Sequence, residues 1–151
     1  MCFIDYIIEF FVAFFATAAF AVLFCVPAKH WGFTGITGGV GWIFYRYFTQ
    51  SQGVVIATFI AVIAVTLLSR IFAVIRRAPV TIFLVTGIFP LVPGVGIYYT
   101  SYYFIMDEFR MASEKGVETL RVAIAIAIGI MCVLIIPQKV FLLLERRPQK
   151  R

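Results

Sequence analysis

Long uncharged stretches separated by short charged segments constrain this chain more than any other feature. Cutting the sequence at its charged residues and at its single histidine leaves five apolar stretches, at residues 10–28, 31–45, 47–69, 78–106 and 122–138. A helix needs roughly 20 apolar residues to cross a hydrocarbon core of about 30 Å. Only 13% of the residues are charged against 63% that are hydrophobic, so folding in water would leave too much apolar surface exposed. We therefore expect a multi-pass membrane protein.

The expected fold class is all-α, with about five transmembrane helices in a single transmembrane domain over residues 1–151. Lipid offers the backbone no hydrogen-bond partners, so only helices and closed barrels cross a membrane. Runs such as residues 122–128 do not supply the alternating segments in the number that a barrel needs. The stretch 31–45 is short and rich in glycine, so a four-span arrangement that leaves it in an external loop stays open as an alternative.

The distribution of basic residues predicts the orientation. Five spans with the N-terminus outside place nine Lys and Arg on the cytoplasmic side and four outside, whereas four spans give eight against five. Cytoplasmic loops carry the excess, so we favour five spans with a cytoplasmic C-terminus. The basic residues, including those of the tail 145–151, stand at the ends of apolar stretches, where they meet anionic lipids. No basic stripe suited to nucleic acid occurs.

The fourth stretch holds the leading candidate site. Its 29 residues, 78–106, would extend about 43 Å as one helix, which exceeds the hydrocarbon core. Pro90 and Pro93, with Gly94 directly after the second proline and Gly96 two residues later, predict a break between two half-helices. Free backbone groups at membrane depth are tolerated only against protein or water, and the N-terminal end of the second half-helix attracts carboxylates. We predict a substrate site there, with a packing kink that binds no ligand as the alternative.

Three further side chains, two after this break and one in the preceding segment, are candidates. Tyr98 and Tyr99 offer hydroxyl groups, although tyrosines at a membrane boundary often serve as interface anchors. Arg70 stands close to a cytoplasmic end, where a basic side chain reaches toward headgroups, and a role in substrate binding is its alternative. The complete candidate substrate-binding set is Pro90, Pro93, Gly94, Gly96, Tyr98, Tyr99 and Arg70.

Two other patterns predict local structure. Glycine recurs every three residues from position 32 to position 41, which indicates a helix-contact face for static packing or for sliding. The one richly charged internal segment, residues 107–121, is expected to form a short external helix. Its predicted ion pairs are Arg110 with Glu114 and Glu118 with Arg121.

Several classes of function are not expected from the residues present. We expect no Asp, Glu, Lys or His at mid-membrane depth, and therefore no internal proton relay. The sequence has no phosphate-binding loop motif, no catalytic triad, and no Cys/His spacing that would hold a metal. The expectation is a transporter without metal, cofactor or enzymatic activity. The alternative is a non-transporting scaffold or assembly protein whose glycine face binds partner helices.

A set of short motifs carries a resemblance to a known family. The motifs are Val26-Pro27, the glycine-rich residues 35–45, Leu68-Ser69-Arg70 before Ala78-Pro79, the core Gly87-Ile-Phe-Pro-Leu-Val-Pro-Gly94 with Tyr98, Gly116, and the Ala/Ile run that ends at Gly129. With these motifs the chain resembles the small-subunit region of the threonine/serine exporter family over most of its length.

The resemblance implies a subunit of a split transporter. It would work beside a larger threonine/serine exporter-like membrane subunit, or with copies of itself. Its substrates would be small amino or carboxylic acids, most directly threonine and serine, with dicarboxylates such as succinate also attributed to relatives. Ion gradients rather than ATP would drive export, and the larger subunit would supply the coupling group.

Overall fold

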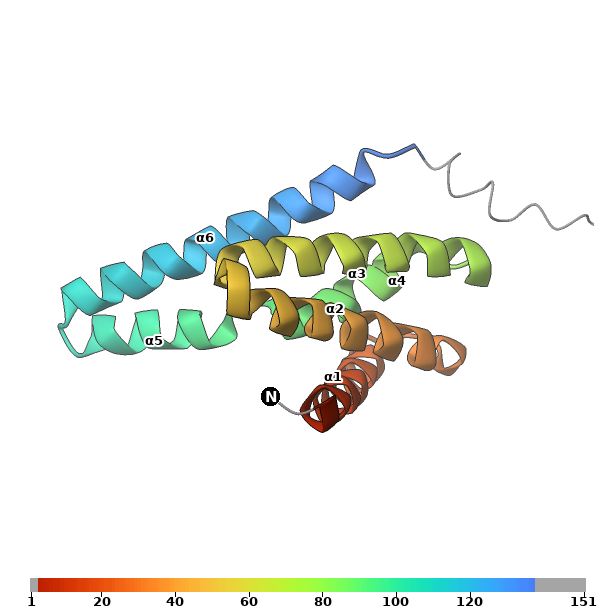
Figure 1. The fold of residues 1–151 in the computed structure, drawn as a ribbon, viewed down its shortest axis with the longest axis horizontal. Coiled ribbons are helices and arrows are strands. Elements are labelled where there is room, and N and C mark those ends of the chain that lie inside the picture. Colours follow the sequence, from red (N-terminus) through yellow and green to blue (C-terminus); the bar gives the residue numbers. More distant parts are fainter. Residues whose placement is uncertain (1–2, 138–151) are drawn as a thin grey trace, which may run out of the picture.

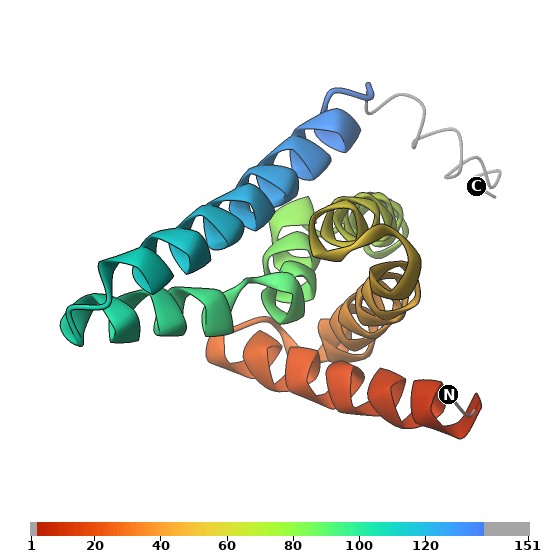
Figure 2. The same ribbon diagram turned by 60° about the vertical axis from the view of Figure 1, so that its left-hand side comes forward.

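The computed structural model describes residues 3–137, and every regular element within that range is a helix. The elements are α1 (Phe3–Leu23), the 3-10 turn η1 (Ala28–His30), α2 (Trp31–Gln52), α3 (Val54–Arg76), α4 (Val80–Ile88), the 3-10 turn η2 (Phe89–Leu91), α5 (Gly94–Ile105) and α6 (Phe109–Leu134). Helices α1 to α4 pack together, while α5 and the first half of α6 form a hairpin that extends away from them (Figures 1 and 2). The expected all-helical class is confirmed.

Three helices, α1, α3 and α6, are long and apolar enough to cross a membrane, and α4 with α5 forms a fourth candidate span that is bent. Helix α2 adds 22 residues, which extend about 33 Å. Its glycines and polar residues lower its hydropathy, although its length suits a crossing. About five crossing helices are consistent with this arrangement.

The boundary between the second and third predicted stretches is wrong. Helix α2 does not stop before Arg46 but continues to Gln52, and Gly53 alone separates it from α3. Gly53 has φ of +80°, a conformation that residues with a Cβ rarely adopt. Treating each charge as the end of a span misplaced this turn, because a charged residue can lie within a membrane helix where it has a partner.

The last helix also begins earlier than predicted. The charged segment is not a separate short helix, because α6 runs without interruption for 26 residues from Phe109. The pair of Arg110 and Glu114 is confirmed, with Nε and Oε1 3.2 Å apart. Glu118 instead accepts from Lys115 at 2.9 Å, so its predicted pairing with Arg121 is wrong. The predicted end of the span at residue 138 and the basic tail lie outside the described residues.

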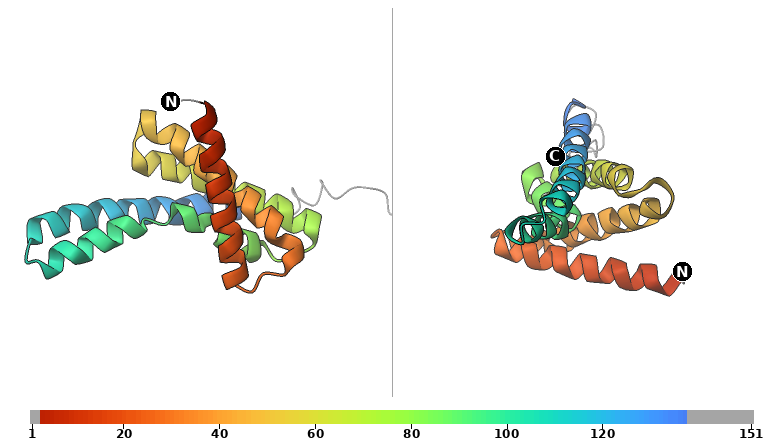
Figure 3. Two further views of the ribbon diagram at one scale, coloured as in Figure 1. Left: turned by 90° about the horizontal axis from the view of Figure 1, so that it is seen from below. Right: turned by 90° about the vertical axis from the view of Figure 1, so that its left-hand side faces the viewer.

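Glycines bring α1 and α3 close to α2. Figure 3 shows α1 crossing the bundle beside α2. A methyl group placed on any of four α2 glycines would crowd a side chain of a neighbouring helix. These contacts are Gly35 with Phe14, Gly38 with Thr17, Gly39 with Phe10, and Gly41 with Val65 of α3. The predicted helix-contact face is therefore confirmed, whereas Gly32 has nothing within 4 Å of its Cβ position.

Buried hydroxyl groups accompany the apolar core. The core cluster comprises Ala61, Val62, Val65, Leu84 and Leu91. The buried hydroxyl groups, which the sequence analysis did not single out, belong to Thr17, Thr34, Thr37, Thr58, Thr66, Ser69 and Thr86. Each donates to a carbonyl three or four residues earlier in its own helix. These bonds satisfy the hydroxyl protons within each helix, so none of them requires a hydrogen bond between helices.

Substituting Gly38→Ala tests this packing. The new methyl group would overlap the Thr17 side chain, and overpacking of this kind costs about 1–3 kcal/mol. We expect the thermal unfolding midpoint of the purified protein in detergent to fall by several degrees. The control Gly32→Ala should leave the midpoint unchanged or slightly higher. Equal midpoints for the two variants would contradict the close α1–α2 contact.

Candidate functional site

The predicted break is present between α4 and α5. Helix α4 ends at Ile88, one 3-10 turn follows, and the axis bends by 52° before α5 continues. Pro93 has φ −76° and ψ 57°, and the Gly94 N–H donates to the Val92 carbonyl at 2.7 Å. This geometry is an inverse γ-turn centred on Pro93. The two half-helices expected from the prolines and glycines are therefore confirmed.

Packing holds the first side of the break in place. The ring of Phe89 lies against Phe20, with centroids 3.7 Å apart, and against Phe24 at 5.9 Å. Leu91 is buried in the core and faces Gly41 of α2. The 3-10 turn is thus fixed to α1 and α2, while the chain after it leaves the bundle.

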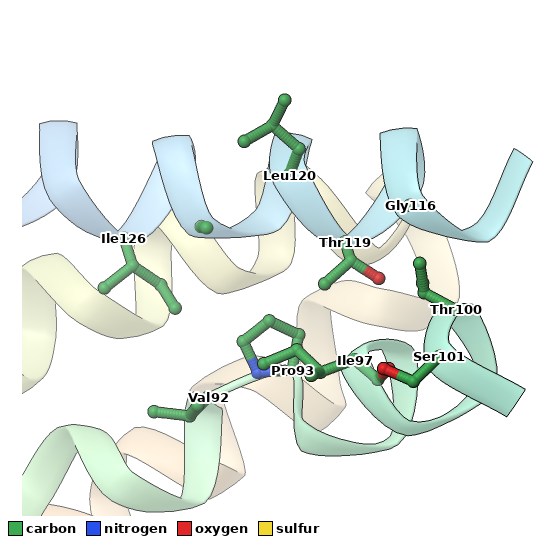
Figure 4. Close-up of a pocket in the computed structure, with 10 residues that line it drawn as sticks. Val92, Pro93, Ile97, Thr100, Ser101, Gly116, Thr119, Leu120 and Ile126 are labelled. Atoms are coloured by element: carbon green, nitrogen blue, oxygen red, sulfur yellow. The ribbon is translucent and has the colours of Figure 1, made fainter. Parts of the chain in front are cut away.

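The other side of the break is open. No residue of α5 is buried, although Gly96 packs against Thr119 and Thr100 against Gly116 on α6. A cavity of about 460 Å³ lies between α5 and α6, and Figure 4 shows the residues that line it, among them Pro93. Its walls are mostly apolar, and the Thr100 hydroxyl donates to the Gly96 carbonyl of its own helix. A small molecule has room here but meets few polar groups.

A second cavity, of about 470 Å³, joins the start of α5 to the start of α3. Three of the predicted residues, Pro93, Gly96 and Tyr99, lie in its wall together with two charged side chains of α6, Lys115 and Glu118. The first residue of α3, Val54, borders the same cavity. This cavity therefore lies beside the N-terminal end of α3 and not beside its middle.

Helix geometry determines which backbone N–H groups beside this cavity are free to donate to a ligand. The first N–H groups of any helix have no acceptor within that helix. The Gly94 N–H already donates to Val92, and the Ile97 N–H to Pro93. The amides of Val95 and Gly96 remain as the donors at the positive end of α5.

Gly94 stands between two residues that line this cavity, Pro93 and Val95, whereas Tyr98 and Pro90 are not brought to it. Tyr98 is 62% exposed and stacks on Tyr102 on the outward side of α5. The Cβ position of Gly94 has nothing within 4 Å. Pro90 lies on the opposite side of the break, where it lines a groove formed by α1 and α2.

That groove contains an ion pair that the sequence analysis did not predict. Glu9 of α1 and Arg46 of α2 are joined through Oε1 and Nε at 3.0 Å, and the Trp42 indole N–H donates to Glu9 Oε2 at 3.3 Å. Glu9 lies within the candidate span Ile4–Leu23, five residues after its first residue, so the predicted start of the first stretch at residue 10 is wrong. A charge at the edge of an apolar stretch predicts a boundary, whereas the pairing of Glu9 with Arg46 across two helices shows that both residues lie within helices.

The comparisons with known proteins agree with this architecture. A family model described as Threonine/Serine exporter, ThrE, matches residues 9–136. The chain belongs to the threonine/serine exporter family. The match begins at Glu9 and includes the whole break, so the resemblance carried by the Pro/Gly core is confirmed. No match was found among curated proteins or solved structures. This exporter-family chain is a multi-pass membrane protein of the transport class.

Arg70 has a different place in this exporter from the one predicted. It is only 6% exposed, and it donates to the carbonyls of Val133 and Ile136, each at 2.6 Å, at the end of α6. The interpretation as a headgroup anchor is therefore wrong. Fourteen helical residues, or about 21 Å, separate Val133 from Thr119, which packs on Gly96. Arg70 caps α6 and does not meet the start of α5.

The single histidine lies in the corner between α1 and α2. His30 is buried and meets the Phe83 ring edge to face, with centroids 5.5 Å apart. Burial, followed by the nearby charges of Lys29 and Arg76, lowers the pKa of His30 below its ordinary value, so the imidazole is neutral near pH 7. Among residues 3–137, no three His, Cys, Asp or Glu side chains form a group that could hold a metal ion.

Substituting Arg70→Ala tests the capping role. The last carbonyls of α6 would lose a charged donor, and hydrogen bonds to a charged group are worth about 1.5–3 kcal/mol. We expect a lower thermal unfolding midpoint and faster proteolysis near the end of α6. The control Arg110→Ala removes a side chain that is 91% exposed and should change neither measurement. An Arg70→Ala protein as stable as the control would contradict the cap.

Proposed function

We propose that this chain is one subunit of a secondary exporter of small carboxylate-bearing metabolites, assembled with a larger membrane subunit. Threonine and serine are the first substrates to consider, and dicarboxylates such as succinate are the second. The family supports the transport of threonine and serine. The proposed setting is a bacterial inner membrane, with one transmembrane domain over residues 1–151, an external N-terminus and a cytoplasmic C-terminus.

The broken span is the observation that carries this proposal. Interrupted helices form substrate sites in secondary transporters, because half-helix ends and free backbone groups face the substrate. In this chain the break is bordered by cavities of about 460 and 470 Å³, sizes that are typical of small-molecule sites. A kink that served packing alone would not need open space beside it.

The exposed side chains of α5 support the proposal that a second subunit packs against this helix. Large apolar side chains cover this helix, including Val95, Ile97 and Ile105. The segment of α6 beside it carries charged pairs, which are costly in hydrocarbon. A hairpin with one apolar helix and one charged flank suits a protein surface with a water-filled passage better than lipid on every side.

The proposed binding step uses the start of α5. A substrate carboxylate would accept hydrogen bonds from the amides of Val95 and Gly96, where the helix dipole adds positive potential. Pro90 and Pro93 would keep the chain from closing into one continuous helix. Tyr99, in the wall of the same cavity, would add a hydroxyl group.

Efflux measurements test whether export requires both this chain and a larger subunit. Threonine efflux is followed in cells that express this chain alone, the polytopic protein encoded beside it alone, and both together. We expect efflux only with both, because the two subunits complete one passage. Efflux from the neighbouring protein alone at the full rate would contradict the proposal and would favour the scaffold alternative.

The variant Gly94→Leu tests the break directly. The Cβ position of Gly94 is open, so the side chain should be accommodated at the mouth of the break without loss of membrane insertion. We expect threonine efflux to be abolished at normal protein abundance. The control Gly32→Leu adds the same side chain at another open position of the chain and should retain efflux. Normal efflux from Gly94→Leu would refute the site.

A further inference from the structure

An oppositely charged pair borders a groove on the α1–α2 side of the break. Glu9 and Arg46 keep 26% and 38% of their side chains exposed. The groove that they line has a volume of about 460 Å³, and its other walls are mainly apolar. The residues lining it are Ile8, Glu9, Val12, Ala13, Ala16, Trp42, Arg46 and Pro90.

This ion pair lies within the depth of the expected membrane. Val65 is eleven residues from either end of α3, Val54–Arg76, and so marks the middle of that span. A methyl group on Gly41 would touch Val65, which places this part of α2 at the same level. Arg46 follows Gly41 by five residues, about 8 Å of helix, whereas each half of the hydrocarbon core is about 15 Å thick.

A half-exposed ion pair at this depth needs more than lipid around it. Charged residues within membrane spans face the protein interior or an aqueous cavity, and they mark substrate pathways. A pair that only held α1 to α2 would be least costly when fully enclosed. Instead, both side chains keep part of their surface exposed and line the groove beside Ile8, Val12 and Pro90, and apolar walls with a few polar groups are typical of small-molecule sites.

Both head groups retain hydrogen-bonding capacity. The contact of Arg46 with Glu9 uses Nε, and a guanidinium has five N–H donors in total. Glu9 accepts one bond on Oε1 and one on Oε2, whereas a carboxylate has about four acceptor positions. Each group can therefore bind a ligand without giving up its present partner.

We propose that this groove binds an α-amino acid in its zwitterionic form, with the ammonium group on Glu9 and the carboxylate on Arg46. The proposal rests on the proposed export function and names the residues that would recognise an amino-acid substrate. A dicarboxylate would bring a second negative charge toward Glu9, which like-charge repulsion disfavours. Trp42 is a positioning residue, because its N–H holds Oε2 of Glu9.

The groove and the start of α5 are two separate positions. Pro90 faces the groove, whereas Pro93 and Gly96 face the cavity on the α6 side. A substrate recognised by its two charges at the first position would then reach the amides of α5 at the second. Substitution in the groove should therefore alter affinity and selectivity, whereas Gly94→Leu should block passage.

Competition experiments with the complex test the groove. The complex is purified from native membranes through a tag on this chain, and the affinities of threonine, 3-hydroxybutyrate and threoninol are compared. The second compound lacks the ammonium group and the third lacks the carboxylate. Glu9→Gln should lower the affinity for threonine by about tenfold, as expected for one lost charge-assisted hydrogen bond. The variant should then bind threonine no more tightly than 3-hydroxybutyrate. Arg46→Gln should bind threonine no more tightly than threoninol.

The control is Glu114→Gln, which breaks the exposed pair with Arg110 and should leave all three affinities unchanged. If either groove variant fails to reach the membrane, Trp42→Phe is used, because it keeps the ion pair. Trp42→Phe should lower the affinity for threonine several-fold and leave the affinity for 3-hydroxybutyrate unchanged. Unchanged threonine affinity in these variants, or an equal loss for all three compounds, would overturn the proposal. Threonine binding without flux in the wild-type complex would contradict the export function and support the groove.

Discussion

The absence of water in hydrocarbon is the constraint on which this structure depends. Every polar group that enters the membrane needs a partner within the protein. Most of the described chain meets this need locally, since buried threonines such as Thr66 donate to their own helix. Arg70 meets it across two helices by capping α6. The break before α5 departs from the pattern, because helix geometry leaves the first amides of α5 without acceptors in that helix.

Close packing around glycine fixes the surroundings of this break. Gly38 and Gly41 allow α1 and α3 to approach α2 from two sides, and Leu91 and Phe89 then fit against the resulting surface. The 3-10 turn is therefore part of the rigid bundle. Helix α5, in contrast, has no buried residue and packs mainly against α6. This contrast places the break where the packed bundle meets the exposed hairpin of α5 and α6.

Sequence reasoning predicted the features that depend on local chemistry. Two prolines three residues apart interrupt a helix whatever surrounds them, so the half-helices were correctly expected. The glycine face was equally predictable, because its spacing matches a helical surface. The helix boundaries at Gly53 and Phe109 were not, since a helix continues through charged residues that have partners nearby. The contacts of Glu9 with Arg46 and of Arg70 with α6 join residues that are distant in sequence, and no local pattern specifies them.

The central claim is that water and substrate reach the backbone at the start of α5 in the assembled exporter. The most direct measurement replaces Cys2, Cys25 and Cys132 by serine, introduces Val95→Cys, and follows its reaction with a membrane-impermeant thiol reagent. Position 95 is exposed in this chain and lines the cavity beside Tyr99 and Lys115. The account predicts labelling in the intact complex that slows when threonine is added. A thiol that stays unreactive in the complex, or that reacts at the same rate with and without substrate, would contradict it.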